Sequence, residues 1–103
     1  MFDRPDAGER AILVHIDFPA ENDREDSDEF FELVRSAGVD PVALITGSRS
    51  QPSPKYFVGS GKLEEVELAL KNNEADVVLF NHALSPSQQR NVEAALETRV
   101  IDR

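Results

Sequence analysis

Four short apolar runs, separated by stretches with helical spacing, limit the folds open to this chain more than any other feature. The runs fall within residues 10–18, 39–46, 76–81 and 99–102. Two of them, Ala11–Val14 and Val77–Phe80, are continuous rather than alternating, which is typical of strands buried on both faces of a parallel sheet. Because strand and helix patterns alternate along the chain, the sequence predicts an α/β domain.

The same alternation predicts the topology. Helix-length connections favour a four-stranded, mostly parallel sheet with right-handed crossovers and helices on both faces. Pro41 cannot donate a backbone hydrogen bond, which places the second strand at a sheet edge and gives the order 2-1-3-4. Open α/β sheets bind ligands beyond the carboxyl ends of the strands where the strand order reverses. We therefore expect Asp17, Asn81 and His82 near such a point.

Three amphipathic stretches predict the helices. The first begins within 23–27 and ends at Gly38, a residue suited to a left-handed C-cap. The second covers 62–73, and the third follows Ser85, which forms a capping box with Gln88. Their predicted buried faces consist of Phe30, Leu33, Val34 and Ala37; Leu63, Val66, Ala69 and Leu70; and Val92, Ala95 and Leu96.

Composition sets the broad class. We expect a flexible N-terminal arm over the polar residues 1–9 and a single domain over 10–103, a normal size for one core. The chain has no cysteine, which excludes disulfides and thiolate metal sites and makes a cytoplasmic location the expectation. No apolar run is long enough to span a membrane.

The distribution of charge matters more than its sum. A net charge of −9 argues against a general nucleic-acid binder. However, no acidic residue occurs between 41 and 63, where Arg49, Lys55 and Lys62 are found. This segment predicts a local basic patch suited to a phosphate backbone.

Two aromatic residues accompany this patch and have two interpretations. Tyr56 and Phe57 suit a surface on which unpaired bases stack, beside the positive charge of Arg49 and Lys55. Alternatively, one ring packs under the loop as core while the other covers it. The sequence leaves both open.

Glycines precede the second helix. In Gly59-Ser60-Gly61-Lys62, backbone N–H groups and the helix dipole favour a bound anion, although a tight turn with a helix cap explains the same residues. The stretch is not a P-loop, because Leu63 follows Lys62 where that motif needs Ser or Thr, and Pro54 stands at the first glycine position. We expect no catalytic residue here.

The two histidines also have two interpretations. His82 would form a base–orienter pair with Asp17 if the two lie within hydrogen-bond reach. Otherwise His15 and His82 are polar strand ends bonded to nearby backbone. The sequence has no nucleophile motif and no spacing of metal ligands.

Several segments together resemble the N-terminal domain of HflX-type ribosome-associated GTPases. The most specific are Tyr56-Phe57-Val58-Gly59-Ser60-Gly61-Lys62 and the Asn-His-x-Leu-Ser-Pro-x-Gln pattern over 81–88. Met1-Phe2-Asp3-Arg4, the run 11–16, Ser36-Ala37-Gly38-Val39, the segment 45–49 and Arg99-Val100-Ile101-Asp102-Arg103 add to it. The resemblance extends over essentially the whole chain.

The resemblance implies that the chain is part of a longer protein. In the family a helical hairpin and a Ras-like GTPase domain follow this α/β domain, and that GTPase domain uses GTP and Mg²⁺. Its guanine-nucleotide motifs are absent here, so the resemblance implies no GTPase residue and no cofactor in this fragment. The implied partner is the large ribosomal subunit with its rRNA, because the family splits stalled or stressed ribosomes.

Candidate residues follow from charge and stacking rather than from a family motif. For rRNA they are Arg49, Lys55, Tyr56 and Lys62. For an accessory, ATP-type nucleotide site with weak NTPase activity they are Gly59, Ser60, Gly61, Lys62, Asp17, Asn81 and His82. A purely structural domain that positions its helical neighbour is the third reading.

Overall fold

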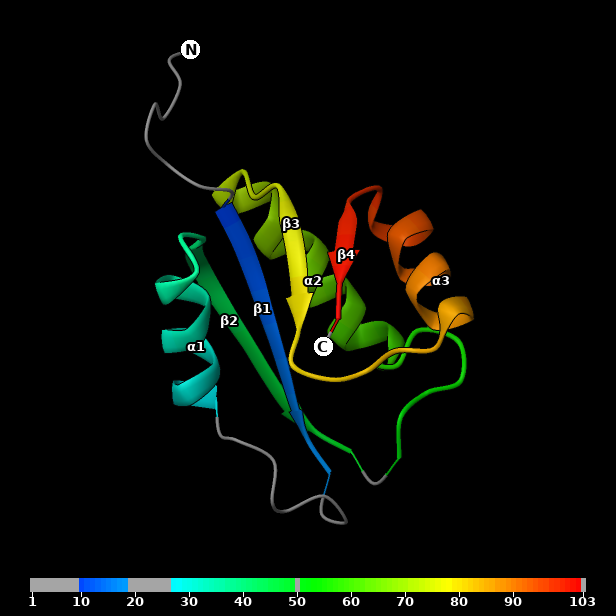
Figure 1. Cartoon of the computed structure of the whole chain (residues 1–103). Helices are drawn as coiled ribbons and strands as arrows, with labels where there is room; N and C mark the ends of the chain where they lie inside the picture. Colours follow the sequence, from blue (N-terminus) through cyan, green and yellow to red (C-terminus); the bar gives the residue numbers. More distant parts are fainter. Residues whose placement is uncertain (1–9, 19–26, 50, 103) are drawn as a thin grey trace.

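The computed structural model describes residues 10–18, 27–49 and 51–102 and confirms the predicted α/β architecture (Figure 1). Its elements are β1 (Arg10–Asp17), α1 (Ser27–Ser36), β2 (Asp40–Ser48), α2 (Ser60–Asn73), β3 (Val77–Phe80), α3 (Pro86–Leu96) and β4 (Arg99–Ile101). All pairings are parallel, in the order β2-β1-β3-β4. The predicted arm over 1–9 and helix start within 23–26 lie outside the described residues.

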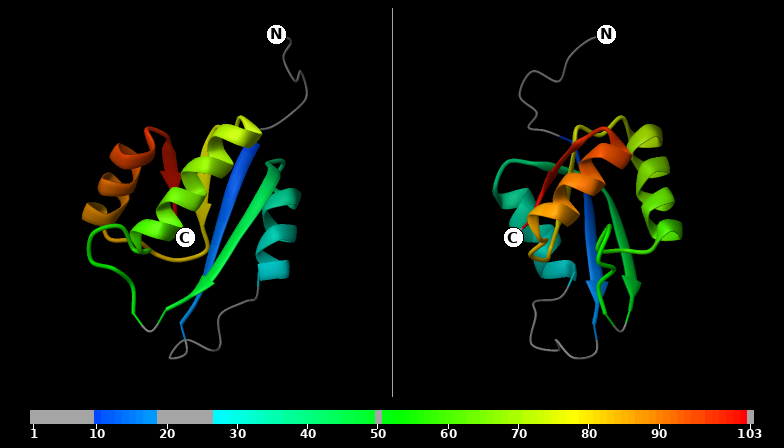
Figure 2. Two further views of the ribbon diagram at one scale, coloured as in Figure 1. Left: turned by 180° about the vertical axis from the view of Figure 1, so that it is seen from behind. Right: turned by 90° about the vertical axis from the view of Figure 1, so that its right-hand side faces the viewer.

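Helices cover both faces of the sheet (Figure 2). On one face, α1 packs Phe30 and Val34 against Ala11, Leu13 and Val77. On the other, α2 and α3 cover the larger cluster, which contains these buried residues: Ile12, Val14, Ile16, Phe18, Ile45, Phe57, Val58, Val66, Leu70, Val78, Phe80, Leu84, Val92, Leu96 and Val100. The continuous apolar runs are therefore buried on both sides, as a parallel sheet requires.

Element boundaries differ from the prediction mainly near the carboxyl edge. The second strand runs two residues further, to Ser48, and α2 begins at Ser60 rather than at residue 62. The capping box at the start of α3 is present, with Ser85 accepting from the backbone of Gln88 and the Gln88 side chain accepting from Ser85.

Three residues of the predicted buried faces, Leu33, Ala37 and Ala95, are exposed. Leu33 has 53% of its surface exposed, although Phe30 and Val34 of the same helix are buried. Ala95 is exposed at a groove between α2 and α3 that no described side chain fills. In all three cases the helix was predicted correctly, but the buried stripe is narrower than predicted.

The C-caps of α2 and α3 are both glutamates, which are unusual at this position. Glu74 and Glu97 occupy left-handed C-cap positions, with φ of 51° and 53°, where glycine has no steric cost. A carboxylate is also unfavourable beside the negative end of a helix dipole. We expect Glu74→Gly and Glu97→Gly each to raise the free energy of unfolding by about 1 kcal/mol, measured by urea denaturation.

Gly38 provides the matched control. It ends α1 with φ of 88°, and a Cβ added there would meet nothing within 4 Å, so Gly38→Ala changes only backbone strain. It is expected to lower the free energy of unfolding by about 1 kcal/mol. If neither glutamate replacement stabilises the fold while Gly38→Ala destabilises it, the side chains of Glu74 and Glu97 make stabilising contacts that offset the strain.

Candidate functional site

The carboxyl edge of the sheet gathers the residues that the sequence singles out. β1 and β3 end there, and α2 begins there after a loop that follows β2 (Figure 1). The candidates divide into two groups. One is buried at the point where the strand order reverses, and the other is exposed around the loop and the start of α2.

Aromatic side chains fill the reversal point between β1 and β3. The His82 ring is 1% exposed, and its centroid lies 5.0 Å from that of Phe57 and 5.5 Å from that of Phe18. The backbone N–H of Ile16 donates to His82 Nε2 over 2.9 Å, which ties the end of β3 to β1. This crevice is packed as core, so His82 and Asn81 do not line an open site.

His82 does not pair with Asp17. Instead His15 Nε2 lies 3.3 Å from Asp17 Oδ1, and the amide nitrogen of Asn81 lies 3.0 Å from His15 Nδ1. The centroids of the two histidine rings lie 5.7 Å apart, with the ring planes tilted by 36°. The contact to Asp17 thus comes from His15 rather than His82, and the backbone contact of His82 is of the kind that the second interpretation expects.

An open cavity lies one strand further, beside the start of α2. It has a volume of about 260 Å³ and is lined by Ile16, Ser48, Arg49, Val58, Gly59, Gly61 and Lys62. Gly59 is the N-cap of α2 and offers no side-chain hydrogen bond to the first turn. The positive end of the α2 dipole thus faces a cavity bordered by two cationic side chains.

Those two cations are held differently. Lys62 Nζ donates to the carbonyl of Thr46 over 2.8 Å and to Glu65 Oε1 over 2.9 Å. Arg49 is exposed, and its Nε donates to the carbonyl of Gln51. Its guanidinium passes so close to Gly59 that a Cβ there would lie 2.9 Å from Nη1. Lys62 is thus held against β2, whereas the Arg49 side chain is exposed at the border of the cavity.

The loop before α2 is fixed to α3. Gln88 Nε2 donates to the carbonyl of Ser53 over 2.8 Å, and Asn91 Nδ2 donates to that of Lys55 over 3.0 Å. Ser53 and Phe57 exchange two backbone hydrogen bonds of 3.0 Å across a tight turn. Phe57 closes this turn with a positive φ of 70°.

The two neighbouring aromatics take separate roles. Phe57 is buried in the core, while Tyr56 is half-buried and packs against the same cluster. Lys55 Nζ lies 5.1 Å from the centroid of the Tyr56 ring, as in a cation–π contact. Core packing of one ring with a covering second ring is therefore the arrangement found, and a base would stack on Tyr56 only after Lys55 moves.

Sequence reasoning missed the residues of α3 that shape this surface. Gln88 and Asn91 hold the loop, and Arg90 places a further exposed cation on the same helix, next to Asn91. The sequence could have indicated an exposed Arg90, since it lies within five consecutive polar residues, 87–91, that precede the apolar Val92. The contact to a loop more than thirty residues away could not be indicated in this way.

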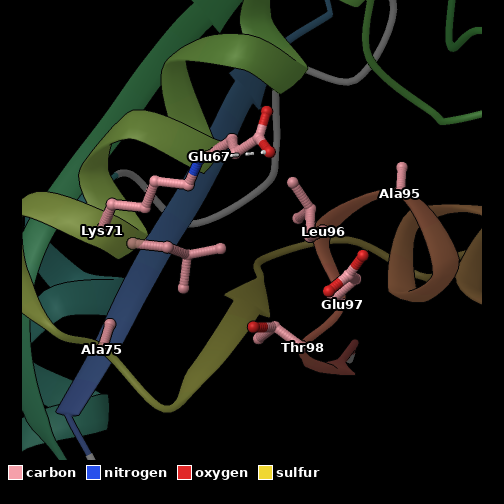
Figure 3. A pocket seen from close by; sticks show the side chains of 8 residues that line it. Glu67, Lys71, Ala75, Ala95, Leu96, Glu97 and Thr98 are labelled. Carbon is pink, nitrogen blue, oxygen red and sulfur yellow. Dashed lines mark ion pairs between the residues drawn. The ribbon is translucent and has the colours of Figure 1, made fainter.

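A second cavity lies away from these candidates, between the C-terminal halves of α2 and α3 (Figure 3). Its volume is about 330 Å³, and Glu67, Lys71, Ala75, Ala95, Leu96, Glu97 and Thr98 surround it with Leu70. Glu67 and Lys71 face one another across one helical turn at 3.8 Å. None of the predicted site residues lines this cavity.

None of the described helices is both long enough and apolar enough to span a membrane.

Comparison with known proteins identifies the same family that the sequence motifs indicate. The family described as GTP-binding GTPase N-terminal matches residues 24–103. The chain is 60% identical to the GTPase HflX of Escherichia coli (strain K12), over all of this chain and 24% of that protein. It is 36% identical to the GTPase HflX of Caldanaerobacter subterraneus subsp. tengcongensis, over 92% of this chain and 22% of that protein.

The chain thus spans about a quarter of the length of the curated relatives it matches. A crystal structure of a mutation variant of SsGBP aligns with a TM-score of 0.63, covering 92% of this chain and 29% of that one. At 17% sequence identity, this similarity concerns the fold.

Proposed function

Because this chain belongs to the GTP-binding GTPase N-terminal family and is an N-terminal domain of HflX GTPases, we propose that it contacts the rRNA of the large ribosomal subunit. In this proposal the full-length protein is a cytoplasmic GTPase that splits stalled or stressed ribosomes. GTP and Mg²⁺ act in a GTPase domain beyond this chain, next to a helical domain, and the present domain contributes binding rather than catalysis.

The observation that supports RNA contact is a fixed cationic loop on an acidic protein. The net charge is −9, yet residues 41–63 contain no acid and present Arg49 and Lys55 at the surface. Gln88 and Asn91 hold the loop backbone in place, so little order has to be gained on binding. Phosphate contacts need only positive charge in a defined position.

The four RNA candidates are not equivalent in this proposal. Arg49 and Lys55 are exposed and carry the contact. The Tyr56 ring makes a cation–π contact with Lys55, so a base can stack on this ring only after Lys55 moves. Lys62 donates hydrogen bonds to Thr46 and Glu65, so it contributes to the positive electrostatic potential rather than to a direct contact with phosphate.

A probing experiment tests the proposal. The chain has no cysteine, so a single thiol introduced by Gln51→Cys carries an iron chelate that releases hydroxyl radicals beside Arg49. We expect cleavage of rRNA in large subunits from this position. Asn72→Cys, exposed at the far end of α2, is the control and is expected to give none. Cleavage from residue 72 alone, or from neither position, would show that the proposed face is wrong.

A second candidate is a nucleotide site at the start of α2. The 260 Å³ cavity, the glycine N-cap and the dipole of a fourteen-residue helix favour it. It predicts ATP binding by calorimetry that Gly61→Val weakens. Gly61 lines the cavity and a Cβ there meets nothing within 4 Å, so the branched side chain takes up space that the nucleotide would need. Asp17, Asn81 and His82 do not line that cavity.

The third reading is a structural domain that only positions its helical neighbour. It predicts unchanged ribosome affinity when residues 1–103 are deleted from the full-length protein, and no cleavage from either probe.

A further inference from the structure

Among the residues that the structure describes, the outer edge of β2 is the longer of the two unpaired sheet edges. β2 is a nine-residue strand at one end of the order β2-β1-β3-β4, whereas β4 at the other end has three residues (Figure 1). An edge strand presents unpaired N–H and C=O groups and is a template for another strand, unless charges, proline or a bulge protect it. How β2 avoids such pairing therefore needs a physical explanation.

The register shows which backbone groups face outward. The N–H of Arg49 donates to the carbonyl of Asp17 in β1 over 3.0 Å. Backbone groups alternate between the two sides of a strand, so those of Leu44 and Thr46 point away from β1, to the outer edge. Pairing with a further strand would use these groups.

The usual protections cover only the beginning of β2. Pro41 removes one donor, and the register with β1 shifts where Ala11 faces Pro41 and Ile12 faces Ala43. From 41 to 48 the strand has no charged side chain. The later half, around Leu44 and Thr46, thus depends on protection from outside the strand.

Lys62 supplies it. Its Nζ donates to the outward carbonyl of Thr46 over 2.8 Å, and Glu65 holds the same ammonium at 2.9 Å. The aliphatic stem lies across Gly47, where an added Cβ would be 3.0 Å from Lys62 Cε. Only 26% of the side chain is exposed, so the residue is fixed in this position. A charge now stands at the edge where an incoming strand would need the Thr46 carbonyl.

We propose that Lys62 is an edge guard, which keeps β2 from pairing antiparallel with β2 of a second copy of this chain. A second copy fits because pairing centred on Leu44 is self-complementary about a two-fold axis, with each Leu44 opposite the other. The absence of charge from 41 to 48 means that the net charge of −9 does not repel at this edge. Gly47 belongs to the device, since its missing side chain leaves room for the lysine stem.

The test compares the oligomeric state of two independent variants. Lys62→Met keeps the stem and removes the ammonium, while Gly47→Ala keeps the ammonium and displaces the stem. In sedimentation velocity over a concentration series, we expect each to self-associate with a dimer dissociation constant roughly five- to tenfold below that of the unaltered chain. Lys71→Met, on the last turn of the same helix and paired with Glu67, is the control and is expected to leave self-association unchanged.

Hydrogen exchange tests whether the contact between the two copies lies at β2. In the Lys62→Met dimer the amide of Thr46 is expected to gain protection as concentration rises. Monomeric behaviour of both variants, or dimers in which Thr46 gains no protection, would overturn the proposal. Loss of rRNA binding without self-association would assign Lys62 to the RNA surface instead.

Discussion

Phe57→Ala is expected to lower the free energy of unfolding by about 3–5 kcal/mol, a large part of the stability of a domain of this size. The ring is 5% exposed and contacts three others, with centroids 5.6 Å from Phe18, 5.9 Å from Phe80 and 5.0 Å from His82. It fills the point where open α/β sheets usually bind ligands, so its removal leaves a cavity at the carboxyl edge. Urea denaturation followed by circular dichroism measures the loss.

The backbone conformation of Phe57 predicts the relative stability of two replacements at this position. With φ of 70° it lies in the left-handed region, which is costly for a bulky residue. Phe57→Gly is therefore expected to be more stable than Phe57→Ala by about 1 kcal/mol. Phe80, buried in β3 with an ordinary strand backbone, is the control, because Phe80→Gly is expected to be less stable than Phe80→Ala. The same order at both positions would contradict the strain at Phe57.

This residue also marks the limit of prediction from sequence. The continuous apolar runs and Pro41 were sufficient for the strand order, because burial on both faces and a missing donor are local properties. Nothing local indicates a left-handed Phe57, which is held there by packing against Phe18, Phe80 and His82. The sequence placed two aromatics at one surface, and only tertiary contacts separate a core ring from a covering one.

The candidate site shows the same division. The acid-free segment and its exposed cations were predictable, since they depend on composition and loop character. The fixation of Lys62 by the carbonyl of Thr46, sixteen residues earlier, depends on α2 crossing the edge strand β2. The bonds from His82 to Ile16 and from Asn81 to His15 depend on the register between β1 and β3. Long-range contacts of this kind have no signature in a single sequence.

Charge reversal at Arg49 and Lys55 is expected to have the largest effect on function. The double variant Arg49→Glu, Lys55→Glu should weaken binding to large ribosomal subunits by roughly 10- to 100-fold and reduce the salt slope by about 2. Both side chains are exposed, so the fold is expected to remain intact. Binding is measured by co-sedimentation, and circular dichroism checks the fold.

A variant with the same change in net charge separates a local effect from a general one. Arg35 and Lys71 are exposed on the last turns of α1 and α2, away from the loop before α2. Reversing both is expected to weaken binding by no more than about threefold, through the long-range field alone. Equal losses in the two double variants would mean that net charge, rather than this surface, governs the interaction.

The central claim is tested most directly by binding of the unaltered chain to purified large subunits at about 50 mM and about 200 mM monovalent salt. We expect binding at the lower concentration that weakens steeply at the higher one, as counterion release from rRNA requires. Binding at neither concentration, or binding that salt leaves unchanged, would contradict an rRNA-contacting domain.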